Sequence, residues 1–283
     1  MTTRIPNTNQ PPTLFFTLAL DAMPFVTWIY PELAKLQFEW EWHVMEGVAA
    51  PSNCTSWVRQ MAPRLSNDGT NGYLRELASF DRRVLHHEKE IWPGGKVQMC
   101  NVPLRHLHEP RLLWQIDADE IWKAEQITTM RNLFIRNKAK NCAWFRCRYF
   151  VGPDVVLTNR DGFGNNGAYE WVRAWKISPG HRFETHEPPK LGGDQPFVPI
   201  PFTRDETEKE GLIFDHYAWA TETQVAFKSS YYGSSNNKEH GADYRDAVKG
   251  WRALQRNESW PVTEVNAYLP WVGAGVTTER TQP

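Results

Sequence analysis

The feature that most constrains the fold is a short apolar run that ends in a dense group of acidic residues. Residues 112–116, Leu-Leu-Trp-Gln-Ile, are mostly apolar and contain no Pro or Gly, which is typical of a central strand covered on both faces. Asp117, Asp119 and Glu120 follow directly. Because ligands bind beyond the carboxyl ends of strands in open α/β sheets, the run predicts that these carboxylates face a ligand.

The acidic group itself indicates a metal. Two carboxylates this close repel each other unless a cation lies between them. Carboxylate oxygens suit Mg²⁺ or Mn²⁺, and Mg²⁺ usually completes its shell with water and substrate phosphates. Asp117 and Asp119 therefore predict a metal site for a diphosphate. A solvated acidic loop is the alternative for a bare Asp-x-Asp motif, but the preceding strand and the surrounding elements favour the metal site.

The chain before this run alternates between strands and helices. A strand over 13–20 ends at Asp21, a helical stretch covers 24–36, and a second strand over 40–45 ends at Glu46. Such a unit implies parallel strands joined by a right-handed crossover. Further strands are expected at 83–87, 142–150, 155–158, 171–177 and 212–216, and further helices at 72–79, from Lys96 to about 108, and at 125–137, 221–232 and 242–256.

These elements predict an α/β fold with a mostly parallel central sheet flanked by helices. At 283 residues and 32.9 kDa, one large domain is favoured over two small ones. We expect that domain to cover residues 13–276, between disordered tails at 1–12 and 277–283. Its first half, to residue 122, has the regular alternation of a nucleotide-binding fold, and the half from residue 123 is more irregular and could shape a second substrate site.

Composition excludes several classes of partner. The net charge is −1, with 32 basic and 33 acidic residues, so no basic excess favours nucleic acid. No apolar run approaches the ~20 residues that span a bilayer, and the first twelve residues lack the layout of a signal peptide. The four cysteines are scattered and form no C-x-x-C pair. We expect a cytoplasmic protein with reduced thiols and no transmembrane segment.

The fourteen tryptophans allow two interpretations. Some, such as Trp40, Trp42, Trp144 and Trp175, lie in strand-like runs and are expected in the core. Trp92, Trp122 and Trp219 stand beside polar motifs, where a flat indole could stack on a sugar or a base. Burial in the core remains the default interpretation for each of them.

Polar residues near the ends of the first four strands should converge if those strands are parallel. They are Asp21, Glu46, Lys96 and the group that begins at Asp117. We expect Glu46 to accept a hydrogen bond from a base or a ribose, and Lys96 to pair with phosphate. The alternatives are that Glu46 caps the next element and that Lys96 is an ordinary surface lysine.

Three segments in order carry a resemblance to a known family. They are Trp114 to Glu120; Trp171 to Trp175 with His181 to Pro189; and Phe214 to Trp219, followed by Gln224, Lys228 and Tyr231. In these segments the chain resembles the GT-A fold glycosyltransferases, especially family 2-like bacterial and viral enzymes whose metal motif reads Asp-x-Asp-Glu. The resemblance covers roughly residues 13 to 232.

The resemblance implies roles for individual residues. Asp119, and Asp117 directly or through water, would hold Mn²⁺ or Mg²⁺ on the diphosphate of a sugar nucleotide, and His216 would complete the metal shell. Arg173 would steady a phosphate or the acceptor. A buried histidine with a backbone partner is the alternative for His216, and a structural ion pair is the alternative for Arg173.

The resemblance also implies a general base. Glu187 matches the carboxylate that deprotonates the acceptor hydroxyl, and Glu170 is the substitute candidate. The implied activity is metal-dependent transfer of a sugar from a nucleoside-diphosphate sugar to a hydroxyl acceptor. Inversion of the anomeric centre is implied by the likeness alone, and a retaining outcome stays open.

Three other activities compete with this interpretation. A glycoside hydrolase also uses two carboxylates but needs no metal cluster at a strand end. The aromatic content would suit a non-catalytic carbohydrate-binding protein. A metal-dependent nucleotidyl- or phosphotransferase would share the acidic cluster and the basic partner. The chain contains neither G-x-x-x-x-G-K-[ST] nor G-x-G-x-x-G, so an NTPase or a dinucleotide enzyme has no support.

Overall fold

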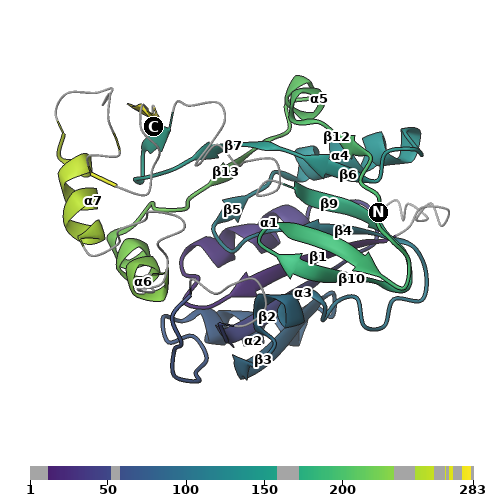
Figure 1. Cartoon of the computed structure of the whole chain (residues 1–283), viewed down its shortest axis with the longest axis horizontal. Helices are drawn as coiled ribbons and strands as arrows, with labels where there is room; N and C mark the ends of the chain where they lie inside the picture. The colour runs from purple at the N-terminus through teal and green to yellow at the C-terminus, as the bar shows by residue number, and fades with distance from the viewer. Residues whose placement is uncertain are drawn as a thin grey trace.

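A seven-stranded sheet with the order β12-β6-β9-β4-β1-β2-β3 lies at the centre of the computed structural model (Figure 1). The structure describes residues 12–51, 58–157, 172–232, 246–257, 265, 268–269 and 276–281. The strands of this sheet are β1 (Thr13–Ala19), β2 (Trp40–Ala49), β3 (Val84–Trp92), β4 (Arg111–Gln115), β6 (Cys142–Trp144), β9 (Val172–Ile177) and β12 (Pro201–Phe202). Strands β4, β1, β2 and β3 are parallel neighbours, while β9 is antiparallel to both β4 and β6.

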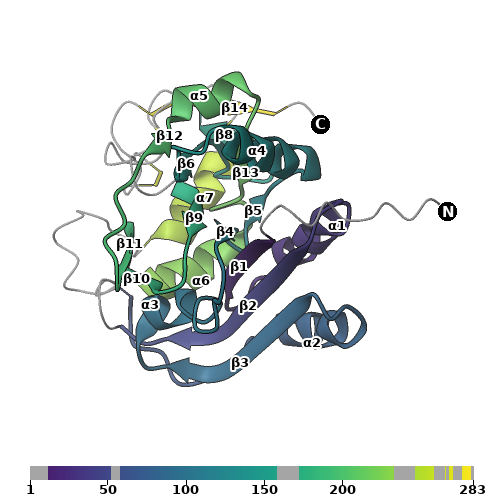
Figure 2. The same ribbon diagram turned by 90° about the vertical axis from the view of Figure 1, so that its right-hand side faces the viewer.

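Alternation along the strands divides the core into two layers. In β1, Phe15 packs into one hydrophobic cluster, and Leu14 and Phe16 pack into the other. The first layer holds the 3-10 helix η1 (Phe25–Trp28) and the helices α1 (Ile29–Leu33), α2 (Thr70–Phe80) and α4 (Ala124–Arg136). The second holds α3 (Gly95–Cys100) and the hairpin of β10 (His181–His186) and β11 (Pro189–Gly193). Figure 2 shows these layers on opposite sides of the sheet.

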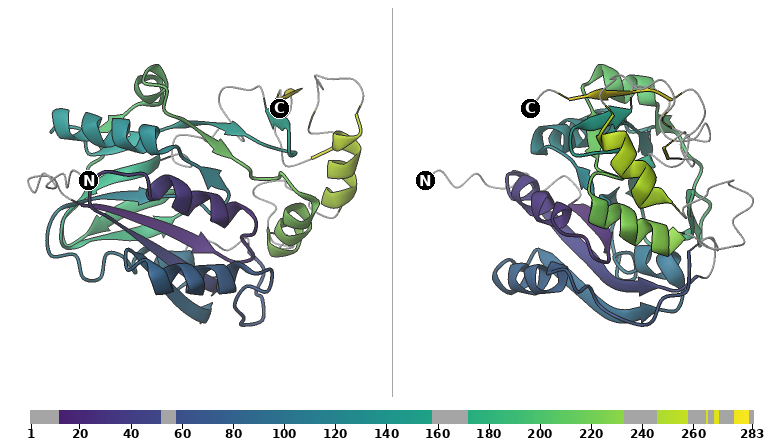
Figure 3. Two further views of the ribbon diagram at one scale, coloured as in Figure 1. Left: turned by 180° about the vertical axis from the view of Figure 1, so that it is seen from behind. Right: turned by 90° about the vertical axis from the view of Figure 1, so that its left-hand side faces the viewer.

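Smaller elements lie beyond one end of the central strands (Figure 3). Strands β5 (Glu120–Ile121), β13 (Ile213–His216) and β7 (Arg146–Tyr149) form a three-stranded sheet, and β14 (Thr278–Arg280) pairs with β8 (Val155–Leu157). The remaining helices are α5 (Arg204–Lys209), α6 (Glu222–Tyr232) and α7 (Ala247–Gln255). None of the helices in the described ranges is both long enough and apolar enough to span a bilayer.

The predicted α/β class with a mostly parallel central sheet flanked by helices is confirmed, and several boundaries differ. The strand expected over 142–150 is two strands in different sheets, because the chain turns at the buried Phe145. The helix expected from Lys96 to about 108 ends at Cys100, because Pro103 disfavours helical backbone in the residue before it and cannot donate a hydrogen bond. The strand expected over 83–87 continues to Trp92.

The C-terminal tail also differs from the prediction. Within 277–283, expected to be disordered, Thr278 to Arg280 form β14. This segment is antiparallel to Val155–Leu157, and Arg280 Nη1 donates to Asp154 Oδ2 at 2.8 Å. Its partners lie about 120 residues earlier in the chain, so local composition does not reveal the pairing.

Burial in the core, the default interpretation of three indoles that stand beside polar motifs, is confirmed, and stacking on a ligand is not supported. Trp92, Trp122 and Trp219 are all buried in the core. Each donates its indole N–H to an acceptor within the protein: the Glu46 carbonyl at 2.9 Å, Glu120 Oε2 at 3.2 Å and the Tyr149 hydroxyl at 3.0 Å, respectively. Each buried indole thus has its N–H satisfied within the protein, as is usual for a tryptophan in a core.

Candidate active site

The acidic group follows β4 at the carboxyl edge of the parallel strands. The Ile116 N–H donates to the Phe16 carbonyl at 3.0 Å, which continues the β1–β4 pairing up to Asp117. The chain then turns, and Glu120 begins β5, where it pairs with His216 of β13. This pairing brings together residues nearly one hundred positions apart. Asp117, Glu120 and His216 can each present one ligand atom within 4.8 Å of the others.

Asp119 is held by side chains from β13 and α6. Its Oδ1 lies 3.4 Å from His216 Nε2. Its Oδ2 accepts from Lys228 Nζ at 2.8 Å and from Gln224 Nε2 at 2.9 Å. Burial alone would raise the pKa of Asp119, but the charges of Lys228 and His216 bring this pKa well below its usual value. Asp119 is therefore an ionised carboxylate.

Arg173 of β9 contacts the other two carboxylates, those of Asp117 and Glu120. Its Nη2 lies 2.9 Å from Asp117 Oδ2 and 2.7 Å from Glu120 Oε1, and its side chain is 5% exposed. Burial opposes ionisation of Asp117, yet the Arg173 charge lowers the pKa of Asp117 overall. For Glu120 burial outweighs Arg173, and its pKa is raised. The guanidinium lies against carboxylates, as expected for the structural ion pair given above as the alternative.

The residues present fit a divalent cation. Carboxylate oxygens and one imidazole are suitable donors for Mn²⁺, and carboxylates with water suit Mg²⁺. The group whose ligand atoms lie close together is Asp117, Glu120 and His216, so it contains two of the three predicted ligands and adds Glu120. The third predicted ligand, Asp119, contacts this group through His216 Nε2 at 3.4 Å. Lys228 places a positive charge beside Asp119, and Arg173 places one beside Asp117 and Glu120.

A second cluster joins α3 to the β10–β11 hairpin. Lys96 Nζ donates to Glu187 Oε1 at 2.6 Å, and His186 Nδ1 lies 3.3 Å from the same oxygen. The Lys96 ammonium also lies 6.0 and 5.5 Å from the ring centroids of Tyr231 and Tyr232 of α6. Two residues predicted for different roles, a phosphate ligand and a general base, thus form one ion pair.

This ion pair changes the acidity of both groups. Burial would raise the pKa of Glu187, but Lys96 and His186 hold it far below its usual range. Burial would lower the pKa of Lys96, and the charge of Glu187 instead raises it well above its usual value. Glu187 is therefore ionised, as a general base must be, but it is a weak base while Lys96 stays bound to it.

Gln115 connects the two clusters. Its Nε2 donates to Asp117 Oδ1 at 2.8 Å and lies 3.4 Å from His186 Nε2. Polar contacts therefore continue from the acidic group through Gln115 and His186 to Glu187. The predicted site residues omitted Gln115, His186 and Lys228. A glutamine within an apolar strand was a usable signal, and Lys228 lies four residues after Gln224, the spacing of one helix face.

Asp21 holds the loop before α2. Arg64 forms a two-point ion pair with the Asp21 carboxylate, and the Asn67 N–H donates to Asp21 Oδ1 at 3.0 Å. Asp21 has a φ of 50°, which an aspartate tolerates better than most residues do. Its carboxylate is engaged within the protein and does not join the acidic cluster.

Glu46 anchors the same loop from β2. Its side chain is 0% exposed and accepts from the Ser66 N–H at 2.9 Å and from Asn71 Nδ2 at 2.8 Å, with His86 Nε2 at 2.7 Å. Burial opposes the charge, but these contacts lower the pKa of Glu46 to about 2. A bulge at Gly47 (φ 123°), where a Cβ would meet the Lys89 carbonyl at 1.7 Å, sets this geometry. In this arrangement the Glu46 carboxylate is not accessible to a base or a ribose.

Glu170, the substitute candidate for the general base, lies outside the described residues.

Comparisons with known proteins found likeness only among solved structures. No protein-family model and no curated protein matched the chain. The mannosyltransferase PcManGT from Pyrobaculum calidifontis, in complex with GDP-Man and Mn²⁺, is 10% identical with a TM-score of 0.42, over 89% of this chain and 66% of that one. S. aureus TarS 1–349 is 14% identical with a TM-score of 0.40, over 58% of this chain and 47% of that one.

A TarS complex with UDP-GlcNAc is 16% identical with a TM-score of 0.37, over 50% of this chain. In the 14% identical match, this chain spans about half the length of TarS 1–349. Fold likeness does not determine function, which depends on the residues of the site.

Proposed function

We propose that this protein is a metal-dependent glycosyltransferase of the GT-A type, which moves a sugar from a nucleoside-diphosphate sugar to a hydroxyl acceptor. One observation carries the proposal: an acidic group of Asp117, Glu120 and His216, with Asp119 beside His216, lies at the carboxyl edge of the parallel strands, and Gln115 connects it to the Lys96–Glu187 pair. An acidic cation site beside a carboxylate with a nearby ammonium suits departure of a diphosphate and deprotonation of a hydroxyl.

In the proposed site, Asp117, Asp119 and His216 would hold Mn²⁺ or Mg²⁺. Such an ion neutralises the negative charge that develops on a departing diphosphate. Arg173 favours the ionised form of Asp117 through a 2.9 Å contact, and Lys228 favours that of Asp119 through a 2.8 Å contact, and both contacts fix the carboxylates in place. Arg173 thus serves as a positioning residue for the acidic group.

Lys96 links donor binding to base strength in this proposal. A donor phosphate close to the Lys96 ammonium would compete with Glu187 for it. As the 2.6 Å contact weakens, the pKa of Glu187 rises and the carboxylate becomes a better proton acceptor. The base then gains strength only when the donor is present.

Glu187 would take the proton of the acceptor hydroxyl as its oxygen attacks the anomeric carbon and the diphosphate leaves. A single displacement of this kind inverts the anomeric centre. His186 Nδ1, 3.3 Å from Glu187 Oε1, would help to orient the carboxylate. Burial of Trp92, Trp122 and Trp219 removes these three indoles as surfaces for the rival carbohydrate-binding function.

The test is turnover with a panel of UDP and GDP sugars and simple glycan acceptors, with Mn²⁺ or with EDTA. We expect nucleoside diphosphate release with Mn²⁺, its loss in EDTA and its loss in Asp119→Asn. Lys249→Met, an exposed change on α7, is the control and should keep activity. Pyrophosphate release would instead identify a nucleotidyltransferase, and full turnover in EDTA would overturn the metal role.

A further inference from the structure

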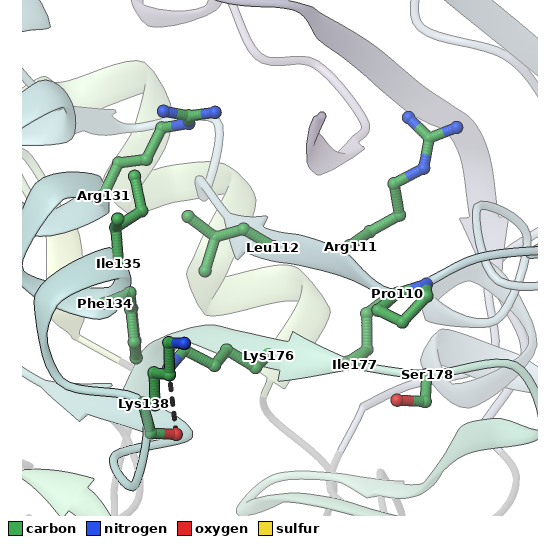
Figure 4. Close-up of a pocket in the computed structure, with 10 residues that line it drawn as sticks. All are labelled: Pro110, Arg111, Leu112, Arg131, Phe134, Ile135, Lys138, Lys176, Ile177 and Ser178. Atoms are coloured by element: carbon green, nitrogen blue, oxygen red, sulfur yellow. Dashed lines mark hydrogen bonds between the residues drawn. The ribbon is translucent and has the colours of Figure 1, made fainter. Parts of the chain in front are cut away.

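Strand β4 ends in a buried polar residue. Its first residues line a cavity of about 390 Å³ (Figure 4), and Leu112, Leu113 and Trp114 are buried apolar residues. Gln115, the last residue of the strand, is only 2% exposed. Its Oε1 is buried and has no hydrogen-bond partner among the described residues. An unsatisfied buried acceptor costs free energy, so a glutamine at this position needs an explanation beyond packing.

Asp117 orients the Gln115 amide. Gln115 Nε2 donates to Asp117 Oδ1 at 2.8 Å. The other carboxylate oxygen, Asp117 Oδ2, pairs with Arg173 Nη2 at 2.9 Å, which favours the ionised form of Asp117. An ionised carboxylate accepts hydrogen bonds and donates none. The amide therefore presents its N–H groups, and not its oxygen, to this side.

The same amide nitrogen faces His186. Gln115 Nε2 lies 3.4 Å from His186 Nε2, and His186 is 7% exposed. Because the amide nitrogen is a donor, His186 Nε2 has to accept, and a neutral imidazole then carries its proton on Nδ1. His186 Nδ1 lies 3.3 Å from Glu187 Oε1, to which it can donate that proton's hydrogen bond. Gln115 thus determines which nitrogen of His186 carries a proton.

A cation bound to Asp117 would favour the opposite arrangement. Asp117 Oδ1 would then interact with the cation and would need the amide N–H less. The amide could turn over and place Oε1 against His186, whose ring would carry its proton on Nε2 after exchange with water. In that state the Gln115 oxygen gains the partner that it lacks here, and His186 Nδ1 no longer donates to Glu187.

We propose that Gln115 is a positioning residue that couples cation binding at Asp117 to the tautomer of His186, and so to the hydrogen bond that Glu187 receives. This inference rests on the cation site of the proposed function. Burial would raise the pKa of Glu187, and Lys96 and His186 lower it. Without the His186 N–H the Glu187 carboxylate is a stronger base, so cation binding prepares it for the acceptor hydroxyl.

Nitrogen NMR of the His186 ring in the full chain, with and without Mg²⁺, tests the proposal. Mg²⁺ is diamagnetic and leaves the spectrum readable. The chain has nine histidines, and the signals of His186 are those missing from His186→Gln. We expect the Nδ1–H tautomer to predominate without Mg²⁺. Saturating Mg²⁺ should shift the ratio of the two tautomers by about fivefold or more, the lower end of typical coupling between two sites.

A variant of Gln115 identifies the residue that carries the coupling. Gln115→Met removes both polar atoms of the amide at similar length, so Mg²⁺ should still bind and should no longer shift the His186 tautomers. Lys138→Gln, an exposed change at the cavity at the other end of β4 (Figure 4), is the control and should respond as the wild type does. A wild-type response in Gln115→Met would overturn the proposal. The wild-type titration tests the coupling even if Gln115→Met does not fold.

The results separate this inference from the proposed function. Calorimetry that shows bound Mg²⁺ while the His186 tautomers stay unchanged would overturn the coupling, and Mn²⁺-dependent turnover would still support the transferase. A shift of the His186 tautomers without turnover of any sugar nucleotide would support the coupling and remove the transferase. Absence of Mg²⁺ binding, with or without UDP or GDP, would overturn the coupling together with the cation site.

Discussion

At the scale of single residues, Lys228 occupies a position that a metal would also favour. Its ammonium lies 2.8 Å from Asp119 Oδ2, the same carboxylate that faces His216. A cation that binds Asp119 has to share that carboxylate with a charge already present. We expect Lys228→Met to bind Mn²⁺ more tightly than the wild type in calorimetry without substrate, and to have a lower melting temperature without metal.

Both readouts are needed to separate the two roles of Lys228. A purely structural lysine would change the melting temperature and leave the Mn²⁺ affinity as it was. Lys249→Met, on the exposed side of α7, is the matched control and should change neither quantity. Weaker Mn²⁺ binding by Lys228→Met would contradict the competition described here.

Glu187 is the residue on which the proposed chemistry depends most. Replacing a general base typically costs ~10²–10⁴ in rate. Glu187→Gln should therefore lose turnover by that order and still bind the sugar nucleotide, because it keeps the shape of the side chain. Glu184→Gln is the control on the same strand: its carboxylate is 41% exposed and pairs with Lys190. Comparable rate losses in both variants would remove Glu187 as the base.

At the scale of elements, the ends of β1 and β2 hold the loop that precedes α2. Glu46 of β2 accepts from the Ser66 N–H and from Asn71, and Asp21 after β1 accepts from Arg64 and Asn67. These contacts fix where α2 begins. The same strand ends were expected to contact the nucleotide, so loop support and ligand binding are alternative roles for one set of carboxylates.

Glu46→Gln distinguishes these roles. A buried amide in place of the carboxylate presents an N–H where an acceptor is needed, so we expect unfolding in urea to become about 1–3 kcal/mol easier. Sugar-nucleotide affinity should stay unchanged in the folded variant. Exposed Glu39→Gln is the control for loss of one charge. Lost affinity with normal stability would instead assign Glu46 to the ligand.

At the scale of the whole molecule, His87 of β3 makes stability depend on pH. Its Nε2 lies 3.1 Å from His43 Nδ1, and the two rings stack with centroids 5.2 Å apart. Burial, together with the charges of His43, His86 and Arg105, lowers the pKa of His87 to about 4. The folded protein thus keeps His87 neutral at a pH where the unfolded chain, with an ordinary histidine pKa of about 6.5, takes up a proton.

The direction of the pH dependence follows from this difference between the folded and unfolded pKa values of His87. The stability contributed by neutral His87 is complete above pH ~6.5 and is lost as the pH falls through ~4, because the unfolded state then binds the extra proton. Melting temperature measured between pH 7 and 4 should therefore fall less steeply in His87→Gln than in the wild type. Identical slopes would show that other groups cause the acid sensitivity in this range.

The local sequence was sufficient for those features that depend on neighbours in the chain. The apolar run before Asp117 determines a buried strand with carboxylates at its end, because strand formation and burial follow from residues within one element. The alternation in β1 and the helical spacing of Ile127, Met130 and Phe134 determine which faces are covered, and so the class of fold. The predicted element boundaries were wrong where a buried residue, Phe145, or a proline, Pro103, ended the element.

Only the tertiary structure decided which charges meet. Lys96 and Glu187 are 91 positions apart, and Asp119 and Lys228 are 109 apart, so no local pattern contains either pair. Their contacts depend on how the β10–β11 hairpin lies against α3 and how α6 reaches the turn that carries Asp119. Electrostatic interactions fall off with distance and with solvent exposure. The acidity of Glu187 and the charge balance of Asp119 are therefore properties of the packed chain, absent from its separate segments.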